Sequence, residues 1–141
     1  MQTVSLNQYF GAKNAPPLVS TFDLIDASRR GLSKKAIAAL AKNLGIAQPE
    51  LLVILHISVR TWQRYSDDKL MPQEVTEKAL LLATLFKQGE EVFGSKEKFS
   101  GWMNHQSLFF RRKRPIELLD TTFGFQLVSN EIIRIEHGVL A

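Results

Sequence analysis

The sequence predicts an all-α fold, with a helical module in the first half joined by one long helix to a small helical domain. Apolar residues recur at helical spacing in successive segments of the chain. Serines, glycines and prolines separate these segments at positions typical of helix ends. No segment shows the sustained alternation of apolar and polar residues that indicates a strand. The sequence contains neither an internal repeat nor a low-complexity segment.

The composition is that of a soluble globular protein. The 141 residues are 45% hydrophobic, with a mean hydropathy of -0.08, and suffice for one full domain or two small ones that share a core. The longest apolar run, from Ala79 to Phe86, is too short to span a bilayer, and the N-terminus lacks the basic-then-apolar order of a secretory signal. The absence of cysteine excludes disulfides and thiolate metal sites. We therefore expect a cytoplasmic protein without membrane contact.

The first part of the chain is predicted to be a tail followed by two helices. Residues 1–19 are expected to form a tail that is mobile or clamped by a partner. A first helix should begin near Ser20 and stop at Gly31. A second helix, capped by Ser33, should end at Gly45, because glycine is common just after the last helical residue.

The stretch from Ile46 to Tyr65 has the layout of two helices joined by a tight turn. The first of them has an apolar face, and the turn at His56 is followed by Ser58, whose hydroxyl can cap a second, short helix. In that second helix Val59 and Trp62 fall on one face, which leaves polar and basic residues for the others. This layout is typical of a DNA-binding helix-turn-helix. The alternative is an ordinary helical hairpin whose arginines are solvated.

Positive charge is concentrated around this stretch. The whole chain has a net charge of +4, whereas residues 29–65 alone hold seven basic residues against one acidic residue, Glu50. Such a local excess is what neutralisation of DNA phosphates requires. If the second helix enters the major groove, Trp62 belongs to the core. The candidates for base or phosphate contacts are then Ser58, Arg60, Thr61, Gln63 and Arg64, with Lys69 on the flank.

Pro72 opens the longest predicted helix, residues 73–93. Its middle, from Ala79 to Phe86, is apolar nearly all round. The pattern has two interpretations: a core helix covered on both sides, or a helix that presents one side to a second copy of the chain. Both hold if the helix links the two halves. Because its apolar surface exceeds what one small module covers, we expect a symmetric homodimer that uses part of it.

Beyond Gly94 the sequence predicts three further helices. They cover about residues 95–104, a short stretch that begins at Pro115, and residues 125–136. The connection between the first two, residues 105–114, holds two phenylalanines followed by four basic residues.

The residue types that catalysis or metal binding needs are not grouped in this sequence. The three histidines are scattered without metal-ligand spacing, and there is no glycine-rich phosphate loop. The adjacent acidic pairs, Asp67-Asp68 and Glu90-Glu91, are typical of solvated surface, because neighbouring residues point to different sides of a helix. We therefore expect a protein that is not an enzyme and that uses no cofactor or metal.

Three motifs follow one another in the second half, and together they resemble a known family. A helix pair reads EVFG and then Trp-Met, a short helix reads RPIELLDT before a glycine, and the terminal helix reads RIEHGV. These motifs resemble the toxin-binding domain of the Xre/MbcA/ParS antitoxins. The first half is similar to the Xre-like helix-turn-helix of the same family, in Gly31-Leu32-Ser33 and in the string from Ile57 to Arg64. Many members have Pro-Asn and Leu-Gly-Gly before the proline helix, where this chain has a bulkier and more basic loop, residues 104–113.

The resemblance implies the antitoxin of a type II toxin-antitoxin system. Its implied partner is a RES-type toxin, which consumes NAD or transfers ADP-ribose from it and which the antitoxin neutralises by covering the active site. The implied antitoxin also binds its own promoter as a repressor, as a homodimer within a hetero-oligomeric complex. We expect a tail (1–19), a helix-turn-helix module (20–71) and a toxin-binding domain (72–141). The alternative is a transcriptional regulator whose C-terminal half only mediates dimerisation.

An inhibitor of such an enzyme can cover the pocket with an ordered chain end. Gly138 lets the chain leave the axis of the last helix, and the apolar residues after it suit insertion into a concave site. The basic loop would steer docking toward an acidic rim or a phosphate-binding mouth. The alternatives are a terminus that packs on its own core and a loop that is merely solvated. The candidate toxin contacts are Arg111, Arg112, Arg114, Arg134, His137, Gly138, Val139 and Leu140.

Overall fold

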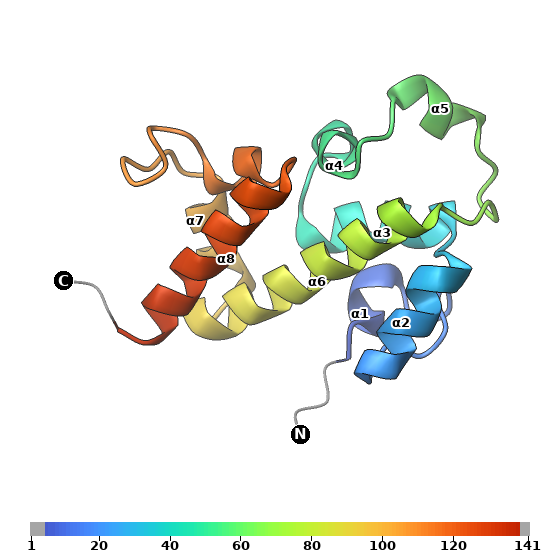
Figure 1. Cartoon of the computed structure of the whole chain (residues 1–141), viewed down its shortest axis with the longest axis horizontal. Coiled ribbons are helices and arrows are strands. Elements are labelled where there is room, and N and C mark those ends of the chain that lie inside the picture. The colour runs from blue at the N-terminus through green and yellow to red at the C-terminus, as the bar shows by residue number, and fades with distance from the viewer. Residues whose placement is uncertain (1–4, 139–141) are drawn as a thin grey trace. The chain divides into compact units, whose positions relative to one another are not determined.

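A computed structural model describes residues 5–138 of the chain, and these residues form eight α-helices and one 3₁₀-helix, without a strand (Figure 1). The prediction of an all-α fold is therefore confirmed. The chain divides into two compact units, unit 1 (Met1–Thr84) and unit 2 (Leu85–Ala141). The division falls within the long helix α6 (Gln73–Phe93). Within the described part of the chain, no single helix has both the length and the apolar character to cross a membrane.

Unit 1 contains five helices before α6. They are α1 (Asn7–Phe10), α2 (Thr21–Arg30), α3 (Lys34–Leu44), α4 (Gln48–Leu55) and α5 (Val59–Arg64). The predicted ends at Gly31 and Gly45 are confirmed, since both glycines follow the last helical residue with positive φ angles of 94° and 70°. Ser33 caps α3 as predicted, because its hydroxyl accepts the N–H of Ala36 at 3.2 Å.

A reciprocal cap fixes the start of α2. The Ser20 hydroxyl accepts the N–H of Asp23, and the Asp23 carboxylate accepts the N–H groups of Val19 at 3.0 Å and Ser20 at 3.1 Å. These backbone donors, Val19 first, hold the pKa of the Asp23 carboxyl below its ordinary value. The cap therefore stabilises the fold above the ordinary carboxyl pKa, and this contribution is lost as the pH falls through the lowered one.

The expectation of a mobile or partner-clamped N-terminal tail is wrong for the described residues up to Leu18. Leu6, Phe10 and Leu18 are fully buried, and α1 lies against α3 in unit 1. Asn43 of α3 donates its side-chain amide to the carbonyl oxygens of Gln8 and Tyr9, at 3.1 and 3.0 Å. The chain itself therefore provides the clamp. Local sequence patterns do not reveal this clamp, because the bonds join residues about 35 positions apart.

The core of unit 1 is built around α3. Its apolar stripe is buried together with the apolar face of α4, in agreement with the predicted periodicity; the buried side chains are Ile37, Leu40, Leu44, Leu51, Leu52, Ile54 and Leu55. Thr76, the buried polar residue of α6, accepts the N–H of Leu32 at 3.1 Å and donates its hydroxyl to the carbonyl of Met71 at 3.3 Å. These bonds hold the start of α6 against the residues that precede α3.

Unit 2 continues from the end of α6. Its further elements are α7 (Lys96–Met103), the 3₁₀-helix η1 (Pro115–Leu118) and α8 (Thr122–Glu136). The last helix begins three residues earlier than predicted, because the Thr121 hydroxyl caps it by accepting the N–H of Gly124 at 2.9 Å. Gly124 lies within α8, and a Cβ there would collide with the carbonyl oxygen of Leu118. Glycine at this position therefore permits the close approach of α8 to η1.

Aromatic rings form the core of unit 2. The ring of Phe99 lies 5.1 Å from that of Phe86, 5.5 Å from that of Phe93 and 6.0 Å from that of Trp102, centroid to centroid. Rings at these separations contact one another favourably. A Cβ at Gly89 would overlap the Phe99 ring. The glycine inside α6 therefore makes room for the ring at the centre of this cluster.

The apolar middle of α6 is largely buried. Between Ala79 and Phe86, Leu81 is the one large apolar side chain that is mostly exposed, at 54%. This burial favours the interpretation of α6 as a core helix. It also restricts any partner-facing apolar surface on this stretch of α6 to the neighbourhood of Leu81.

Candidate functional site

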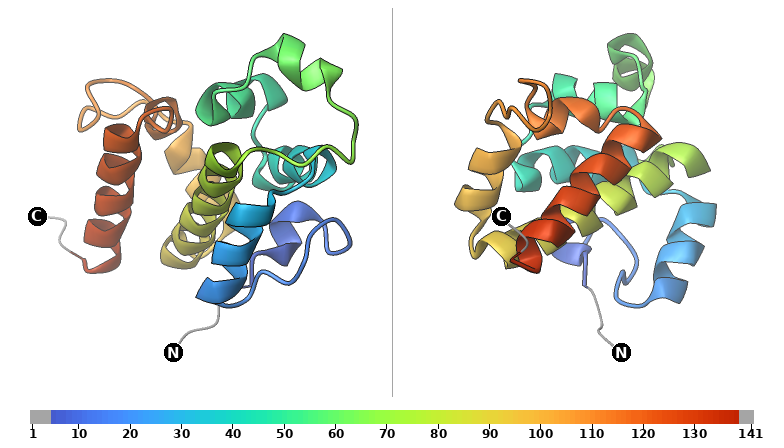
Figure 2. Two further views of the ribbon diagram at one scale, coloured as in Figure 1. Left: turned by 45° about the vertical axis from the view of Figure 1, so that its right-hand side comes forward. Right: turned by 60° about the vertical axis from the view of Figure 1, so that its left-hand side comes forward.

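The turn between α4 and α5 has the geometry of a tight helix-turn-helix. His56 ends α4 in the left-handed conformation, with φ 60° and ψ 41°, a region in which histidine is more common than most residues with a Cβ. The N–H of Ile57 then bonds the carbonyl of Leu52 at 3.0 Å. Ser58 starts α5 as predicted, since its hydroxyl accepts the N–H of Thr61 at 3.0 Å. Figure 2 shows α5, in green, followed by an extended segment that leads to α6.

The side chains of α5 divide into one anchor and an outward face. Trp62 is 4% exposed and anchors the helix in unit 1. Arg60 and Arg64 lie two residues before and after it, about 160° round the helix axis, and both are exposed. Gln63 is exposed as well. Val59 was expected on the face of Trp62 but is 51% exposed. It lies three residues before Trp62, so the two side chains point in directions about 60° apart around the helix axis.

Two of the predicted DNA contacts are already bonded to each other. The Ser58 hydroxyl donates to the Thr61 hydroxyl oxygen at 2.9 Å in addition to capping the helix. Lys69 is exposed beyond α5, with its ammonium 5.7 Å from the centroid of the Tyr65 ring. The side chains best placed for a partner are therefore Arg60, Gln63 and Arg64, with Lys69 beside them.

A lysine that sequence reasoning did not single out holds the end of α5. The ammonium of Lys34 donates to the carbonyl oxygens of Trp62 at 2.8 Å and Tyr65 at 2.9 Å, and lies 5.0 Å from the Trp62 ring centroid. A cation is favourable at these carbonyls because the C-terminal end of a helix carries partial negative charge. Lys34 begins α3, so this contact ties the outward helix to the core helix.

The backbone reinforces the same connection. The N–H of Lys34 bonds the carbonyl of Lys69 at 2.8 Å, and the N–H of Lys35 bonds that of Asp67 at 3.0 Å. The N–H of Met71 bonds the carbonyl of Leu32 at 2.8 Å. The segment after α5 is thus paired with the start of α3, which fixes the C-terminal end of the short helix.

We expect Lys34→Met to destabilise unit 1 by about 1–2 kcal/mol, since the variant leaves two helix-end carbonyls without their charged donor. Affinity of the helix-turn-helix for DNA should fall with it, because α5 is no longer held. Lys35→Met is the matched control, since it removes the same charge from an exposed neighbour. Chemical denaturation measures the stability and fluorescence anisotropy measures the DNA affinity. Equal effects of the two substitutions would show that only net charge matters.

In unit 2 the residues predicted to contact the toxin differ in whether their side chains already bond other residues of the unit. Arg114 donates to the Asn104 side-chain oxygen at 3.2 Å and to the Glu117 carboxylate at 3.3 Å. The backbone N–H of Arg114, followed by its side chain, keeps the pKa of the Glu117 carboxyl below its ordinary value. Arg114 therefore supports the start of η1, and its side chain is the least available of the basic cluster.

The remaining contacts lie at the loop and at the end of α8. Arg111 and Arg112 are exposed, and both have positive φ angles, 56° and 66°. The Arg134 guanidinium lies 5.6 Å from the centroid of the Phe109 ring, a contact that sequence reasoning missed, and 3.5 Å from the Glu131 carboxylate. His137 and Gly138, both exposed, follow the last helical residue. The predicted contacts Val139 and Leu140 lie outside the described residues.

Comparison with known families agrees with this two-part organisation. Residues 23–83 match the antitoxin Xre-like helix-turn-helix domain, and residues 88–138 match the antitoxin Xre/MbcA/ParS C-terminal toxin-binding domain. A comparison with curated proteins finds no match. A DNA-binding helix-turn-helix domain and a toxin-binding domain in one chain define an antitoxin, which is not an enzyme. The chain belongs to the Xre/MbcA/ParS antitoxins.

Proposed function

We propose that this antitoxin neutralises a RES-type toxin by covering its active site, and that it represses its own promoter in the cytoplasm. The observation that carries the proposal is the presence of both matched domains in one chain. The RES-type chemistry of the toxin, which consumes NAD or ADP-ribosylates a target, rests on the family resemblance of the EVFG, PIELL and RIEHGV motifs.

The organisation of α5 supports promoter binding. Arg60 and Arg64 project from the face opposite the buried Trp62, and the face of a recognition helix that lies in the major groove must be polar and unobstructed in this way. Arginine can bond two acceptors of a guanine at once. We therefore assign base or phosphate contacts to Arg60, Gln63 and Arg64, and a flanking phosphate contact to Lys69. Ser58 and Thr61 act as the cap that positions these residues, and their outer atoms can still meet the DNA backbone.

The end of α8 supports active-site covering. His137 follows the helix with its N–H bonded to the carbonyl of Ile133 at 3.1 Å, and Gly138 turns the chain with a positive φ of 67°. The apolar residues that follow, beginning at Val139, lie outside the described residues. In this proposal the cationic Arg134 and the exposed His137 flank the segment that enters the toxin.

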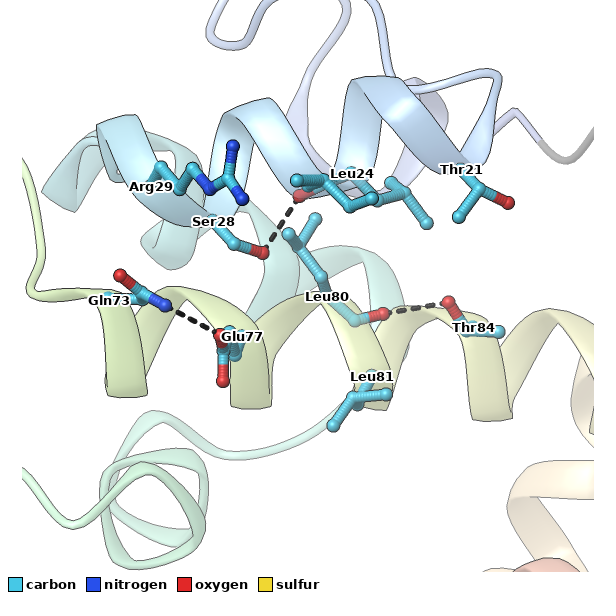
Figure 3. A pocket seen from close by; sticks show the side chains of 10 residues that line it. Thr21, Leu24, Ser28, Arg29, Gln73, Glu77, Leu80, Leu81 and Thr84 are labelled. Atoms are coloured by element: carbon cyan, nitrogen blue, oxygen red, sulfur yellow. Dashed lines mark hydrogen bonds between the residues drawn. The ribbon is translucent and has the colours of Figure 1, made fainter.

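A homodimer is part of the proposal, and the surface that supports it is a groove between α2 and α6 of unit 1. Figure 3 shows the two helices side by side with Leu24 and Leu80 between them, and Leu81, which also lines the groove, on the side of α6 away from α2. The groove has a volume of about 390 Å³ and is mainly apolar. Phe22, 76% exposed, stands on the same helix as Leu24. A second copy of the chain is the occupant proposed here, because in a two-fold dimer each copy can offer its exposed Phe22 to the apolar groove of the other.

Light scattering should therefore give a mass of twice 16.0 kDa for the purified chain. We expect Leu81→Lys to weaken the dimer roughly thirtyfold or more, because a charge would be desolvated at the interface. Val53→Lys is the matched control, since it adds the same charge at a residue of α4 that is 62% exposed and outside the groove. A monomer at high concentration, with and without toxin, would reject the dimer.

The experiment that tests the proposed function is co-expression with the product of the adjacent open reading frame. The antitoxin should co-purify with that product, restore growth, and suppress its consumption of NAD. A regulator whose C-terminal half only mediates dimerisation is the second candidate, and the match of residues 88–138 to a toxin-binding domain argues against it. That candidate predicts promoter binding without co-purification.

A further inference from the structure

The loop between α7 and η1 is a closed structure in unit 2. Residues 107–113 are drawn together by two bonds between the loop ends: Ser107 N–H to the Lys113 carbonyl at 3.1 Å, and Arg112 N–H to the Ser107 carbonyl at 2.7 Å. Phe110 N–H also bonds the Ser107 carbonyl, at 3.1 Å. This loop appears in orange after α7 in Figure 1. Its backbone bonds give it a defined shape in place of a solvated connection.

The tip of this loop presents apolar side chains to solvent. Leu108 is 81% exposed and Phe109 is 49% exposed. The next residue, Phe110, is 3% exposed, with its ring 5.9 Å from that of Trp102 and 4.9 Å from that of Phe109. Phe110 thus anchors the loop in the aromatic core of unit 2. The fold makes no use of the Leu108 side chain, since that residue is almost entirely in water.

The backbone that follows the tip is strained. Arg111 and Arg112 are consecutive residues in the left-handed region, with φ angles of 56° and 66°. A residue with a Cβ is disfavoured there, and glycine or asparagine would adopt the same turn at less cost. Such strain tends to occur at functional sites, where the side chain contributes more than the backbone conformation loses. Arg111 and Arg112 are both exposed, so we attribute the presence of arginine at these strained positions to the positive charge of the side chains.

A cation–π contact connects the loop to α8. The guanidinium of Arg134 lies 5.6 Å from the Phe109 ring centroid. Leu127 and Phe123, about two and three turns before Arg134 on the same side of α8, are 43% and 84% exposed. The loop tip therefore contacts α8 at Arg134, on the side of the helix that also carries these two exposed apolar residues, and both elements belong to the matched toxin-binding domain.

We propose that residues 107–113 form a docking wedge, in which Leu108 and Phe109 enter an apolar pocket of the toxin while Arg111 and Arg112 pair with an acidic rim around it. This inference rests on the proposed function and adds a second contact to it. The wedge supplies affinity and partner choice, whereas the end of α8 covers the active site. Charge pairs at such a rim accelerate association, and buried apolar anchors slow dissociation.

The test measures binding of the full-length antitoxin to the purified product of the adjacent open reading frame by surface-immobilised kinetics. The Leu108→Ser/Phe109→Ser variant should bind at least about thirtyfold more weakly, through faster dissociation. Val53→Ser is the control, since it removes an exposed apolar side chain from unit 1. Promoter binding of both variants should stay at the wild-type value, because neither change lies in α5. The thermal transition of the double variant should fall slightly, because the half-buried Phe109 ring packs against that of Phe110, and Leu108→Ser alone, at a residue that is 81% exposed, should leave it at the wild-type value.

A second variant separates the charge from the backbone. Arg111→Gly/Arg112→Gly keeps the left-handed turn and removes both guanidinium groups. We expect its thermal stability to be unchanged or higher, and its association to be slower and less dependent on salt. If this variant associates at the wild-type rate, the proposed pairing of Arg111 and Arg112 with an acidic rim on the toxin is wrong.

Other outcomes would overturn the wedge or the proposed function separately. Wild-type toxin affinity in Leu108→Ser/Phe109→Ser would reject the wedge and leave the proposed function standing. Loss of promoter binding with toxin affinity intact would make the loop a nucleic-acid contact and would also reject the wedge. No binding of the wild-type chain to the product would reject the proposed function itself.

Discussion

The Arg60→Ala/Arg64→Ala variant should bind the promoter at least about thirtyfold more weakly than the wild-type chain. Each arginine that makes a bidentate contact to a guanine contributes about 1–3 kcal/mol of discrimination. Both project from α5 on the side opposite Trp62, so their removal leaves the anchor of the helix intact. The dependence of affinity on salt should also become shallower, because fewer counterions are released from the phosphates. Anisotropy titrations at several salt concentrations measure both quantities.

Lys35→Ala/Lys42→Ala provides the control, since it removes two exposed positive charges from α3 and leaves α5 untouched. It should lower the affinity only modestly. Both variants need to be measured with and without the toxin, because DNA binding can depend on the complex. Unchanged affinity of a folded Arg60→Ala/Arg64→Ala chain in both settings would mean that α5 is not the recognition helix.

A chain that ends after Glu136 should lose inhibition of the toxin and keep its binding to the promoter. The truncation removes His137, Gly138 and the apolar residues that follow, and leaves α8 and its packing complete. The residues removed are the ones proposed to enter the active site. Toxin activity on NAD is assayed at saturating antitoxin, so that a change of affinity alone cannot explain the result.

The full-length variant Val139→Ser/Leu140→Ser refines the truncation experiment. It keeps the length of the chain and removes the apolar character of its end. Inhibition should weaken if that character matters, because the end would no longer suit a concave apolar site. Full inhibition by the truncated chain would contradict the covering mechanism and leave inhibition to contacts made elsewhere in unit 2.

Local sequence signals predicted the helices other than α1, and the outward face of α5. Ser33, Ser58 and Ser95 each cap a helix by a bond to a residue three positions later, so the sequence alone locates them. The exposure of Arg60 and Arg64 follows from helical periodicity once Trp62 is assigned to the core. These features depend on neighbours within one or two helical turns, which is the range that sequence patterns describe.

Features that join distant residues could not be predicted in this way. Lys34 reads as an exposed lysine at the start of a helix, yet its ammonium bonds carbonyls 28 and 31 residues away. The same limit applies to α1, which a Pro-containing segment gave no reason to place against α3. Arg114 belongs to a run of four basic residues, but only the fold brings Asn104 and Glu117 to it. The end of the chain was assigned to the active site of the toxin because of its apolar character, and that assignment stays a prediction.

The two tryptophans of the chain fall one in each unit, Trp62 in unit 1 and Trp102 in unit 2. Each unit thus contains one tryptophan whose fluorescence can report on that unit alone. In a Trp102→Phe variant the emission would report only the docking of α5, where Lys34 lies over the indole ring. In a Trp62→Phe variant it would report only the aromatic core around Phe99. Superimposable denaturation curves from the two variants would mean that the two units unfold in one cooperative transition. Separate curves would give the midpoint of unfolding of each unit.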